Sequence, residues 1–158
     1  MIFVSVGTHP QQFDRLLKKI DELIEQGKIT DKVIAQTGYS AYNPKNYSAK
    51  KFIGIEEFDR MIKKADLFIT HAGEGNIGTA LQLEKKMVVV PRRYKFDEHT
   101  NDHQMELAEA VEKENQAIVV YEINELAEAI RKANKLKTKK TEHAKRIINL
   151  IESSVREW

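Results

Sequence analysis

Short apolar runs alternate with segments of helical apolar spacing along the whole chain. The runs are three to five residues long and are typical of strands buried in a parallel sheet. The predicted strands span residues 2–6, 32–36, 51–53, 67–70, 87–90 and 117–120.

Between these runs, apolar side chains recur three and four residues apart, which predicts helices with one buried face. The first helix is expected to have Pro10 at its first position, where a missing N–H costs nothing, and to end at Gly27. Further helices are predicted around residues 58–65, 73–82, 105–111 and 126–133. The last apolar positions at helical spacing, expected to pack back on the domain, are Ile147, Ile148, Ile151 and Val155.

This order of strands and helices predicts an α/β fold. We expect a doubly wound, Rossmann-like parallel sheet of about six strands with helices on both faces. A chain of 158 residues fits one ordinary domain of this kind.

Composition narrows the function classes. The 26 basic and 24 acidic residues leave a net charge of +2, so the overall charge does not call for a nucleic-acid partner. The absence of cysteine excludes disulfides and thiolate metal sites. No apolar run approaches the roughly 18–20 residues of a membrane span, and Met1 leads directly into the first strand rather than into a signal peptide. We therefore expect a cytoplasmic protein.

Glycines and hydrogen-bonding residues gather directly after the predicted strands. Ligands of open parallel sheets bind beyond these carboxyl ends, although each cluster alone is equally typical of a tight turn. The clusters are Gly7-Thr8-His9, Gln36-Thr37-Gly38, the segment from His71 to Asn76, and Pro91-Arg92-Arg93.

Gly73, Gly75 and Gly78 are spaced as G-x-G-x-x-G at the start of a predicted helix. Glycines let the backbone approach a phosphate, and the helix amino end offers free N–H groups without need of a metal. A dinucleotide fingerprint would normally follow the first strand and precede an acidic residue, whereas here the motif follows the fourth strand and the next strand ends in Arg92-Arg93. A dinucleotide-binding domain remains an alternative.

The polar loop at residues 92–104 carries further candidates. Arg92 and Arg93 suit a phosphate, while Asn101, Asp102 and Gln104 could bind sugar hydroxyls. Two other interpretations are open. One is a metal site at His99, Asp102 and His103, and the other is a solvated loop with an Asn or Asp helix cap.

Several stretches together carry a resemblance to a known family. They are residues 4–8, 13–16, 36–38, 65–73, 91–93, 98–99, 101–104 and 107–108. With them, the chain resembles the carboxyl-terminal, donor-binding domain of family 28 GT-B glycosyltransferases. It resembles the one-domain Alg13-like subunits and the bacterial PssE-like exopolysaccharide subunits more closely than the two-domain enzymes.

The resemblance implies one nucleotide-sugar-binding domain, residues 1–158, that forms half of a GT-B fold. It implies the donor-binding, catalytic subunit of an inverting UDP-sugar-dependent glycosyltransferase, which modifies a lipid-linked saccharide in polysaccharide biosynthesis. The acceptor would be bound by a separate Alg14- or PssD-like membrane-associated subunit, which would recruit this chain to the inner face of the membrane. Neither a cofactor nor a metal is expected.

The resemblance also implies site residues. Expected to bind the donor are Gly7, Thr8, Gln36, Thr37, Gly38, His71, Ala72, Gly73, Gly75, Asn76, Thr79, Arg92, Arg93, Asn101, Asp102, His103 and Gln104. The general base is expected on the partner subunit, and the local candidates for it are His9, His71 and His103.

Two residues depart from the family pattern. Thr79 stands where two-domain relatives hold the ribose with a glutamate, and Glu74 stands where relatives have a small residue. A carboxylate at Glu74 would repel a diphosphate unless it turns outward. A non-catalytic accessory subunit is therefore a further alternative. The basic tail at residues 135–146 is either a solvated face or a contact for a membrane or partner.

Overall fold

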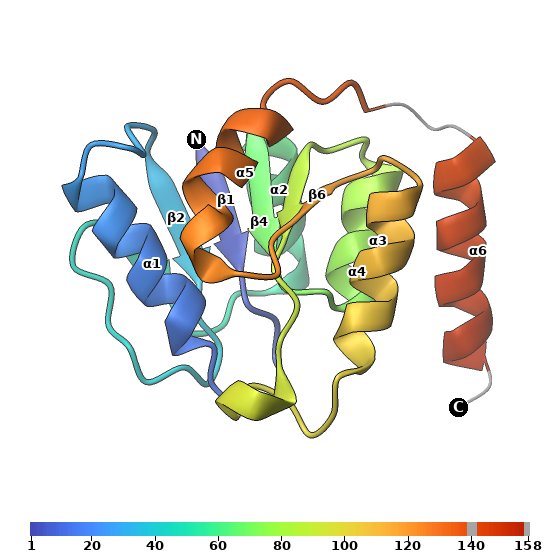
Figure 1. Ribbon diagram of the computed structural model, residues 1–158, viewed down its shortest axis with the longest axis horizontal. Coiled ribbons are helices and arrows are strands. Elements are labelled where there is room, and N and C mark those ends of the chain that lie inside the picture. Colours follow the sequence, from blue (N-terminus) through green and yellow to red (C-terminus); the bar gives the residue numbers. More distant parts are fainter. Residues whose placement is uncertain (139–141, 157–158) are drawn as a thin grey trace.

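A single six-stranded parallel sheet forms the centre of the molecule. The computed structural model describes residues 1–138 and 142–156, and it is shown in Figure 1. The strands are β1 (Ile2–Ser5), β2 (Val33–Gln36), β3 (Ser48–Lys50), β4 (Leu67–Thr70), β5 (Met87–Val89) and β6 (Ile118–Val119). Their order across the sheet is β3-β2-β1-β4-β5-β6, which is the order of a doubly wound Rossmann sheet.

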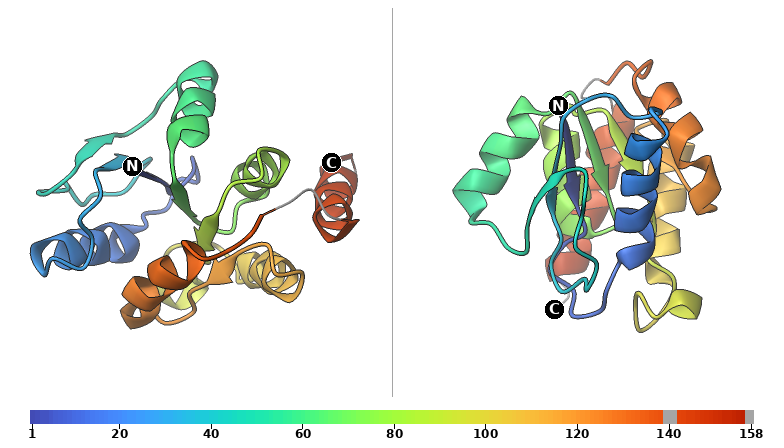
Figure 2. Two further views of the ribbon diagram at one scale, coloured as in Figure 1. Left: turned by 90° about the horizontal axis from the view of Figure 1, so that it is seen from above. Right: turned by 90° about the vertical axis from the view of Figure 1, so that its left-hand side faces the viewer.

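Helices cover both faces of the sheet, as Figure 2 shows from two directions. The α-helices are α1 (Asp14–Glu25), α2 (Ile55–Lys64), α3 (Glu74–Gln82), α4 (His103–Lys113), α5 (Leu126–Ala133) and α6 (Glu142–Arg156). Two short 3₁₀ helices, η1 (Tyr94–Phe96) and η2 (Ile123–Glu125), lie in connections.

Side chains alternate between two hydrophobic cores along β1, β4, β5 and β6, as the period of a β-strand requires. In β1, Ile2 and Val4 enter the core under α1 and α5, while Phe3 enters the opposite core. The second core is completed by side chains of α2, α3, α4 and α6. The fold class expected from the sequence is thus confirmed, with six strands and helices on both faces.

The third strand lies earlier than expected. The sequence predicts residues 51–53, whereas β3 is Ser48–Lys50, and all three of its side chains are exposed. Its ladder with β2 sets the register, because Ile34 pairs with Ser48 and Gln36 pairs with Lys50. The apolar Phe52 and Ile53 follow the strand and line a cleft instead.

The expected position of Pro10 is also wrong, because α1 begins only at Asp14. The preceding segment is held in a loop: the Phe13 N–H donates to Ser40 Oγ at 2.9 Å, and the carbonyl of Gln11 accepts from Arg92. The end of α1 at Gly27 is confirmed. Gly27 adopts φ +71°, and its N–H donates to the carbonyl of Ile24.

The last helix packs back on the second core, as expected. Ile147 is buried, and Ile148 and Ile151 pack against the same cluster. The expectation for Val155, and the part of the basic tail at residues 139–141, lie outside the described residues and side chains. None of the helices in the described ranges has the length and apolarity needed to cross a membrane.

Candidate functional site

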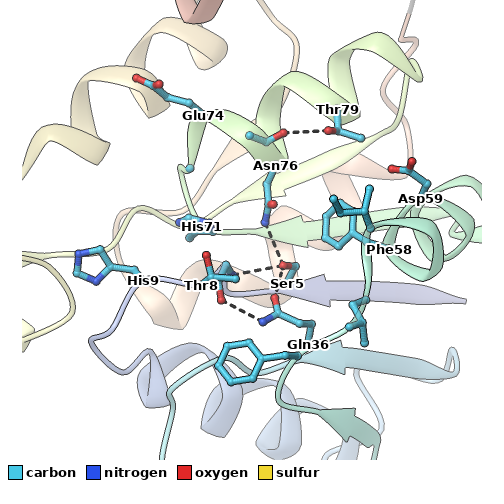
Figure 3. A pocket seen from close by; sticks show the side chains of 16 residues that line it. Ser5, Thr8, His9, Gln36, Phe58, Asp59, His71, Glu74, Asn76 and Thr79 are labelled. Carbon is cyan, nitrogen blue, oxygen red and sulfur yellow. Dashed lines mark hydrogen bonds between the residues drawn. The ribbon is translucent and has the colours of Figure 1, made fainter. Parts of the chain in front are cut away.

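A cleft of about 600 Å³ opens at the carboxyl ends of β1, β2 and β4. Figure 3 shows it with His9 near one end and Asp59 and Thr79 near the other. The predicted site residues that line it are Gly7, Thr8, His9, Gln36, His71, Gly73, Gly75, Asn76 and Thr79.

The floor of the cleft is a network of side chains from adjacent strand ends. Ser5 pairs in register with both Gln36 and Thr70, so their side chains lie next to one another. The Ser5 hydroxyl donates to Gln36 Oε1 at 2.7 Å and accepts from Asn76 Nδ2 at 3.0 Å. Asn76 also donates to the hydroxyl of Thr70 at 3.0 Å. These bonds hold the first turn of α3 against the sheet.

His71 follows β4 and is almost fully buried, with 8% of its surface exposed. Its ring lies against the backbone of both Gly7 and Gly73. A Cβ at Gly7 would come within 2.3 Å of His71 Nε2, and one at Gly73 within 2.1 Å of Cε1. Both positions must therefore be glycine for the ring to lie where it does.

The buried side chain of Gln104 contacts His71 from the other side. Its amide nitrogen lies 3.0 Å from His71 Nδ1. Burial, followed by the charge of Arg92, lowers the pKa of His71 to about 3. The ring is therefore neutral at physiological pH.

The amino end of α3 faces the cleft at Gly73 and Gly75. The first N–H groups of a helix have no intrahelical acceptor and carry a positive partial charge. A Cβ at Gly75 would meet nothing within 4 Å, so the missing side chain leaves open space at the helix end. Glu74 lines the cleft but is exposed, and in Figure 3 its carboxylate is directed away from the Ser5–Gln36–Asn76 floor.

At the end of the cleft away from Asp59 and Thr79, the rings of His9 and His99 stack with their centroids 4.3 Å apart. His9 Nδ1 accepts the N–H of Gln11, and His99 Nδ1 accepts the N–H of Asn101. Burial and then the neighbouring His99 lower the pKa of His9, while burial and then Arg92 lower that of His99. The pair joins the loop after β1 to the loop after β5.

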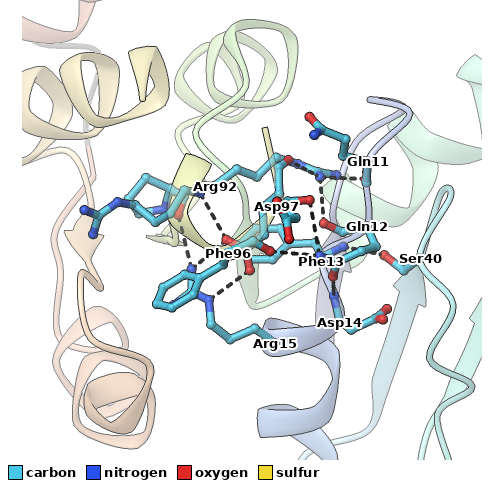
Figure 4. Close-up of polar contacts among 12 residues, drawn as sticks. Gln11, Gln12, Phe13, Asp14, Arg15, Ser40, Arg92, Phe96 and Asp97 are labelled. Carbon is cyan, nitrogen blue, oxygen red and sulfur yellow. Dashed lines mark hydrogen bonds and ion pairs between the residues drawn. The ribbon is translucent and has the colours of Figure 1, made fainter. Parts of the chain in front are cut away.

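Arg92 does not line the cleft, and its contact with a phosphate stays a prediction. Its side chain is fully buried, and Nη2 donates to the carbonyl of Val6 at 2.6 Å. Nη1 donates to the carbonyls of Gln11 and Glu98 at 2.8 and 3.0 Å. Figure 4 shows Arg92 beside Gln11, and these contacts fasten the loop after β1 to the loop after β5.

The loop at residues 92–104 is ordered by further contacts of this kind. The Arg93 N–H donates to Glu98 Oε1 at 3.1 Å, and the Arg93 side chain pairs with Asp102 at 3.5 Å. Gln104 Oε1 accepts the N–H groups of Ala72 and Arg92. The Gln104 amide and the Asp102 carboxylate thus bind protein groups and do not line the cleft, and their contacts with a donor stay predictions.

The remaining predicted residues do not line the cleft either. The Asn101 side chain accepts the N–H of His103 at 2.9 Å, whereas the cap residue of α4 is Asp102, whose side chain forms no cap hydrogen bond, so the helix-cap interpretation is not confirmed. Gly38, with φ +56°, is a turn residue whose Cβ would lie 2.6 Å from the carbonyl of Gly7. Those absent from the cleft lining are Thr37, Gly38, Ala72, Arg92, Arg93, Asn101, Asp102, His103 and Gln104.

The metal-site alternative at His99, Asp102 and His103 also lacks the expected geometry. His99 Nδ1 is engaged by a backbone N–H, and Asp102 Oδ1 accepts from Tyr94 at 3.0 Å. Across the described parts of the chain, no three histidine or carboxylate side chains are grouped to hold a metal ion.

Sequence reasoning missed one wall of the cleft. The wall consists of Phe52, Ile53, Ile55, Phe58 and Asp59, and Ser5 in the floor was missed as well. Ile55 is 83% exposed and Phe52 is 48% exposed. These exposed apolar residues, clustered between a strand and a helix start, are the signal that could have located this wall.

The parallel sheet in Rossmann order, with a glycine-lined polar cleft at its carboxyl ends, defines the class of Rossmann-like α/β domains. The particular family follows from comparison with known proteins. Residues 1–156 match the glycosyltransferase family 28 C-terminal domain, and the chain belongs to this family.

Curated relatives agree with this assignment. The chain is 32% identical over 122 residues to the UDP-N-acetylglucosamine transferase subunit ALG13 of Homo sapiens, a match covering 72% of this chain and 10% of that protein. It is 28% identical over 118 residues to the UDP-N-acetylglucosamine–N-acetylmuramyl-(pentapeptide) pyrophosphoryl-undecaprenol N-acetylglucosamine transferase of Prochlorococcus marinus, covering 72% of this chain and 31% of that protein. The chain thus spans only a part of each relative.

Solved structures share the fold. The glycotransferase of kitacinnamycin aligns with a TM-score of 0.66 at 21% identity, over 96% of this chain and 38% of that chain. MurG of Acinetobacter baumannii aligns with a TM-score of 0.55 at 17% identity, over 95% of this chain and 49% of that chain. The domain is therefore built like one half of a GT-B glycosyltransferase.

Proposed function

We propose that the cleft binds a UDP-sugar and that the chain is the donor-binding subunit of an inverting glycosyltransferase. The observation that carries the proposal is the convergence of His71 and the amino end of α3 on a cleft where Gly7, Gly73 and Gly75 expose the backbone. Such a surface suits a diphosphate, because N–H groups and a helix dipole offset negative charge without a metal.

The cleft offers different surroundings along its length. The diphosphate would lie at the α3 amino end, and the base would lie against the apolar wall of Phe52, Ile53 and Phe58. Between these regions, Asp59 on α2 and Thr79 on α3 line the cleft and would face the ribose.

In the proposed reaction, an acceptor hydroxyl oxygen attacks the anomeric carbon of the sugar. The bond from that carbon to the diphosphate oxygen breaks, and the electron pair leaves with UDP. The N–H groups at the start of α3 stabilise the charge that grows on the diphosphate. The hydroxyl proton passes to a general base.

The general base is proposed on a partner subunit. His71 is a poor base, since its pKa of about 3 leaves it little affinity for a proton. His9 has a lowered pKa and an engaged Nδ1, and His103 lies outside the cleft. A separate acceptor-binding subunit of the Alg14 or PssD type would supply the base, hold a lipid-linked acceptor and bring this chain to the membrane.

The relatives support a donor of this chemistry. Both the human subunit and the Prochlorococcus enzyme are named as UDP-N-acetylglucosamine or N-acetylglucosamine transferases. The bacterial relative is named for an undecaprenol-linked acceptor, which supports a lipid-linked saccharide here.

Calorimetric titration with UDP and UDP-sugars tests the donor site through a matched pair of variants. Gly75 and Gly78 both lie in α3, and a Cβ at either meets nothing within 4 Å, yet only Gly75 lines the cleft. Alanine strengthens a helix by about 1 kcal/mol relative to glycine, so both variants should fold. We expect Gly75→Ala to weaken UDP binding and Gly78→Ala to leave it unchanged. Equal affinities in the two variants would contradict binding at this place.

A non-catalytic accessory subunit is the second candidate, and the exposed carboxylate of Glu74 beside the α3 amino end favours it. It predicts no saturable binding of any UDP compound to the isolated chain. Co-purification with an Alg14-like membrane protein, followed by a transfer assay, separates the two roles. Sugar transfer that is unchanged in Gly75→Ala would support the accessory role. Tight NADPH binding without response to UDP would instead favour the dinucleotide alternative.

A further inference from the structure

The orientation of the Gln104 amide is set by two backbone donors. Its Oε1 accepts the N–H of Ala72 at 3.2 Å and the N–H of Arg92 at 3.0 Å. Only an oxygen can accept these bonds, so the amide nitrogen must be the atom that lies 3.0 Å from His71 Nδ1.

This orientation decides where the proton of His71 lies. An amide nitrogen only donates, so Nδ1 must offer a lone pair, and a neutral ring then carries its proton on Nε2. Arg92, His9 and His99 all disfavour the charged ring, and burial adds the largest effect.

The Nε2 atom lies where a ligand would approach. It is bordered by the backbone of Gly7 and Gly73, and all three residues line the cleft. Within the described residues, no hydrogen bond is formed by Nε2, whereas Nδ1 is occupied. We propose that Gln104 is a positioning residue that fixes His71 as a neutral Nε2–H donor to a diphosphate oxygen of the substrate.

Gln104 is expected from the sequence to bind the sugar of the donor, whereas the positioning role places it on His71. The positioning role rests on the proposed function for the identity of the ligand alone, since the position of the proton is a property of the free protein.

The variant Gln104→Glu separates a positioning role from simple packing. It has nearly the same shape, and one carboxylate oxygen can still accept from Ala72 and Arg92. The other oxygen cannot donate, so it would accept a hydrogen bond from an N–H at His71 Nδ1. The neutral ring would then turn a lone pair on Nε2 towards the diphosphate, and the added negative charge would raise the pKa of His71.

Nitrogen-15 NMR of the ligand-free protein tests the position of the proton. We expect His71 of the wild type to show a protonated Nε2 and an unprotonated Nδ1, and Gln104→Glu to show a protonated Nδ1. A wild-type ring protonated on Nδ1 would overturn the inference, whether or not the protein binds nucleotide.

Titration with UDP-glucose tests the effect on binding, because its diphosphate diester keeps a constant charge around neutral pH. Wild-type affinity should change little between about pH 8 and about pH 6, since the ring stays neutral. Gln104→Glu should bind about tenfold more weakly at the higher pH and recover as the ring is protonated at the lower pH. The exposed Gln26→Glu controls for added charge and should match the wild type.

The outcomes separate the inference from the proposed function. If Gln104→Glu binds with wild-type affinity at both pH values, the positioning role is overturned while the donor site stands. If the wild type binds no UDP compound, the donor site and the diphosphate contact both fail, and the NMR result still decides whether Gln104 sets the proton on His71.

Discussion

The carboxylate of Glu98 is buried against the guanidinium of Arg15, which lies 83 residues earlier in the chain. Arg15 donates to both carboxylate oxygens, at 2.9 and 3.0 Å, and Glu98 also accepts the N–H of Arg93. The bridge fastens α1 to the loop after β5. Arg93 and Glu98 belong to the polar loop at residues 92–104, so these contacts first of all hold that loop in place at the rim of the cleft.

Removal of the Glu98 side chain should strongly destabilise the fold. Glu98→Ala leaves the Arg15 charge without its partner in a mostly buried place, a change that typically costs about 3–5 kcal/mol. Urea unfolding measures the loss of unfolding free energy. Glu98→Gln retains an acceptor for Arg15 and should lose less, so equal losses in the two variants would contradict a role for hydrogen bonding in the bridge.

Arg92 should stabilise the folded state through the shape of its guanidinium rather than through its charge. Arg92→Lys keeps a positive charge but cannot reach the carbonyls of Val6, Gln11 and Glu98 together, so it should lose roughly 2–4 kcal/mol of unfolding free energy. Hydrogen exchange should rise in the loop after β1. The control is Arg93→Lys in the same loop, which should cost less than about 1 kcal/mol. Wild-type stability in Arg92→Lys would contradict a stabilising role for the three hydrogen bonds from Arg92.

Much of the fold could be predicted because buried parallel strands carry continuous apolar runs, as in Leu67–Thr70. The position of β3 could not be predicted in this way, because β3 is an edge strand whose side chains are all exposed. The apolar signal next to it, at Phe52 and Ile53, reflects the cleft wall and not the sheet. Apolar residues thus mark both buried positions and positions that line a cleft, and a single sequence does not separate them.

The cleft itself could be predicted in part, because glycine and polar residues at strand ends must meet at one edge of a parallel sheet. Gly7, His71 and Gly73 meet there as expected. Arg92 and Gln104 do not, because buried backbone carbonyls and N–H groups compete for the same side chains that would suit a ligand. Residue type alone does not reveal whether such a side chain binds the backbone or a ligand.

Replacement of Glu74 by glutamine should strengthen UDP binding. Its carboxylate lies at the first turn of α3, where it opposes a second anion even though it turns outward. Charges at a helix end contribute about 0.3–1 kcal/mol, so we expect a gain of roughly two- to fivefold at low salt. Calorimetry at low and high salt measures it, and the gain should shrink with salt. Weaker binding in Glu74→Gln would instead mean that the carboxylate contacts the ligand.

Asp59 should make the site selective for ribonucleotides. The Thr79 hydroxyl donates to the carbonyl of Gly75 at 3.0 Å, whereas a ribose diol needs an acceptor for two protons. A carboxylate at Asp59 offers two oxygens on the facing wall. We expect the wild type to prefer UDP to 2′-deoxy-UDP, and Asp59→Asn to lose most of that preference with about tenfold weaker UDP binding. The exposed Asp31→Asn is the control. An unchanged ratio in Asp59→Asn would exclude a ribose contact.

The buried His71 should make stability depend on pH. The unfolded chain takes up a proton at this residue near pH 6.5, whereas the pKa in the folded state is about 3. The unfolded state therefore binds more protons between these values, and unfolding free energy is lost as the pH falls through this window. His71→Asn removes this contribution and should reduce the slope by up to about 1.4 kcal/mol per pH unit. Part of the slope should remain, because His9 and His99 also have lowered pKa values. Urea unfolding at a series of pH values measures the slope. Above the window, the difference between wild type and variant should stay constant. A variant with the full wild-type slope would show that His71 is charged in the folded protein.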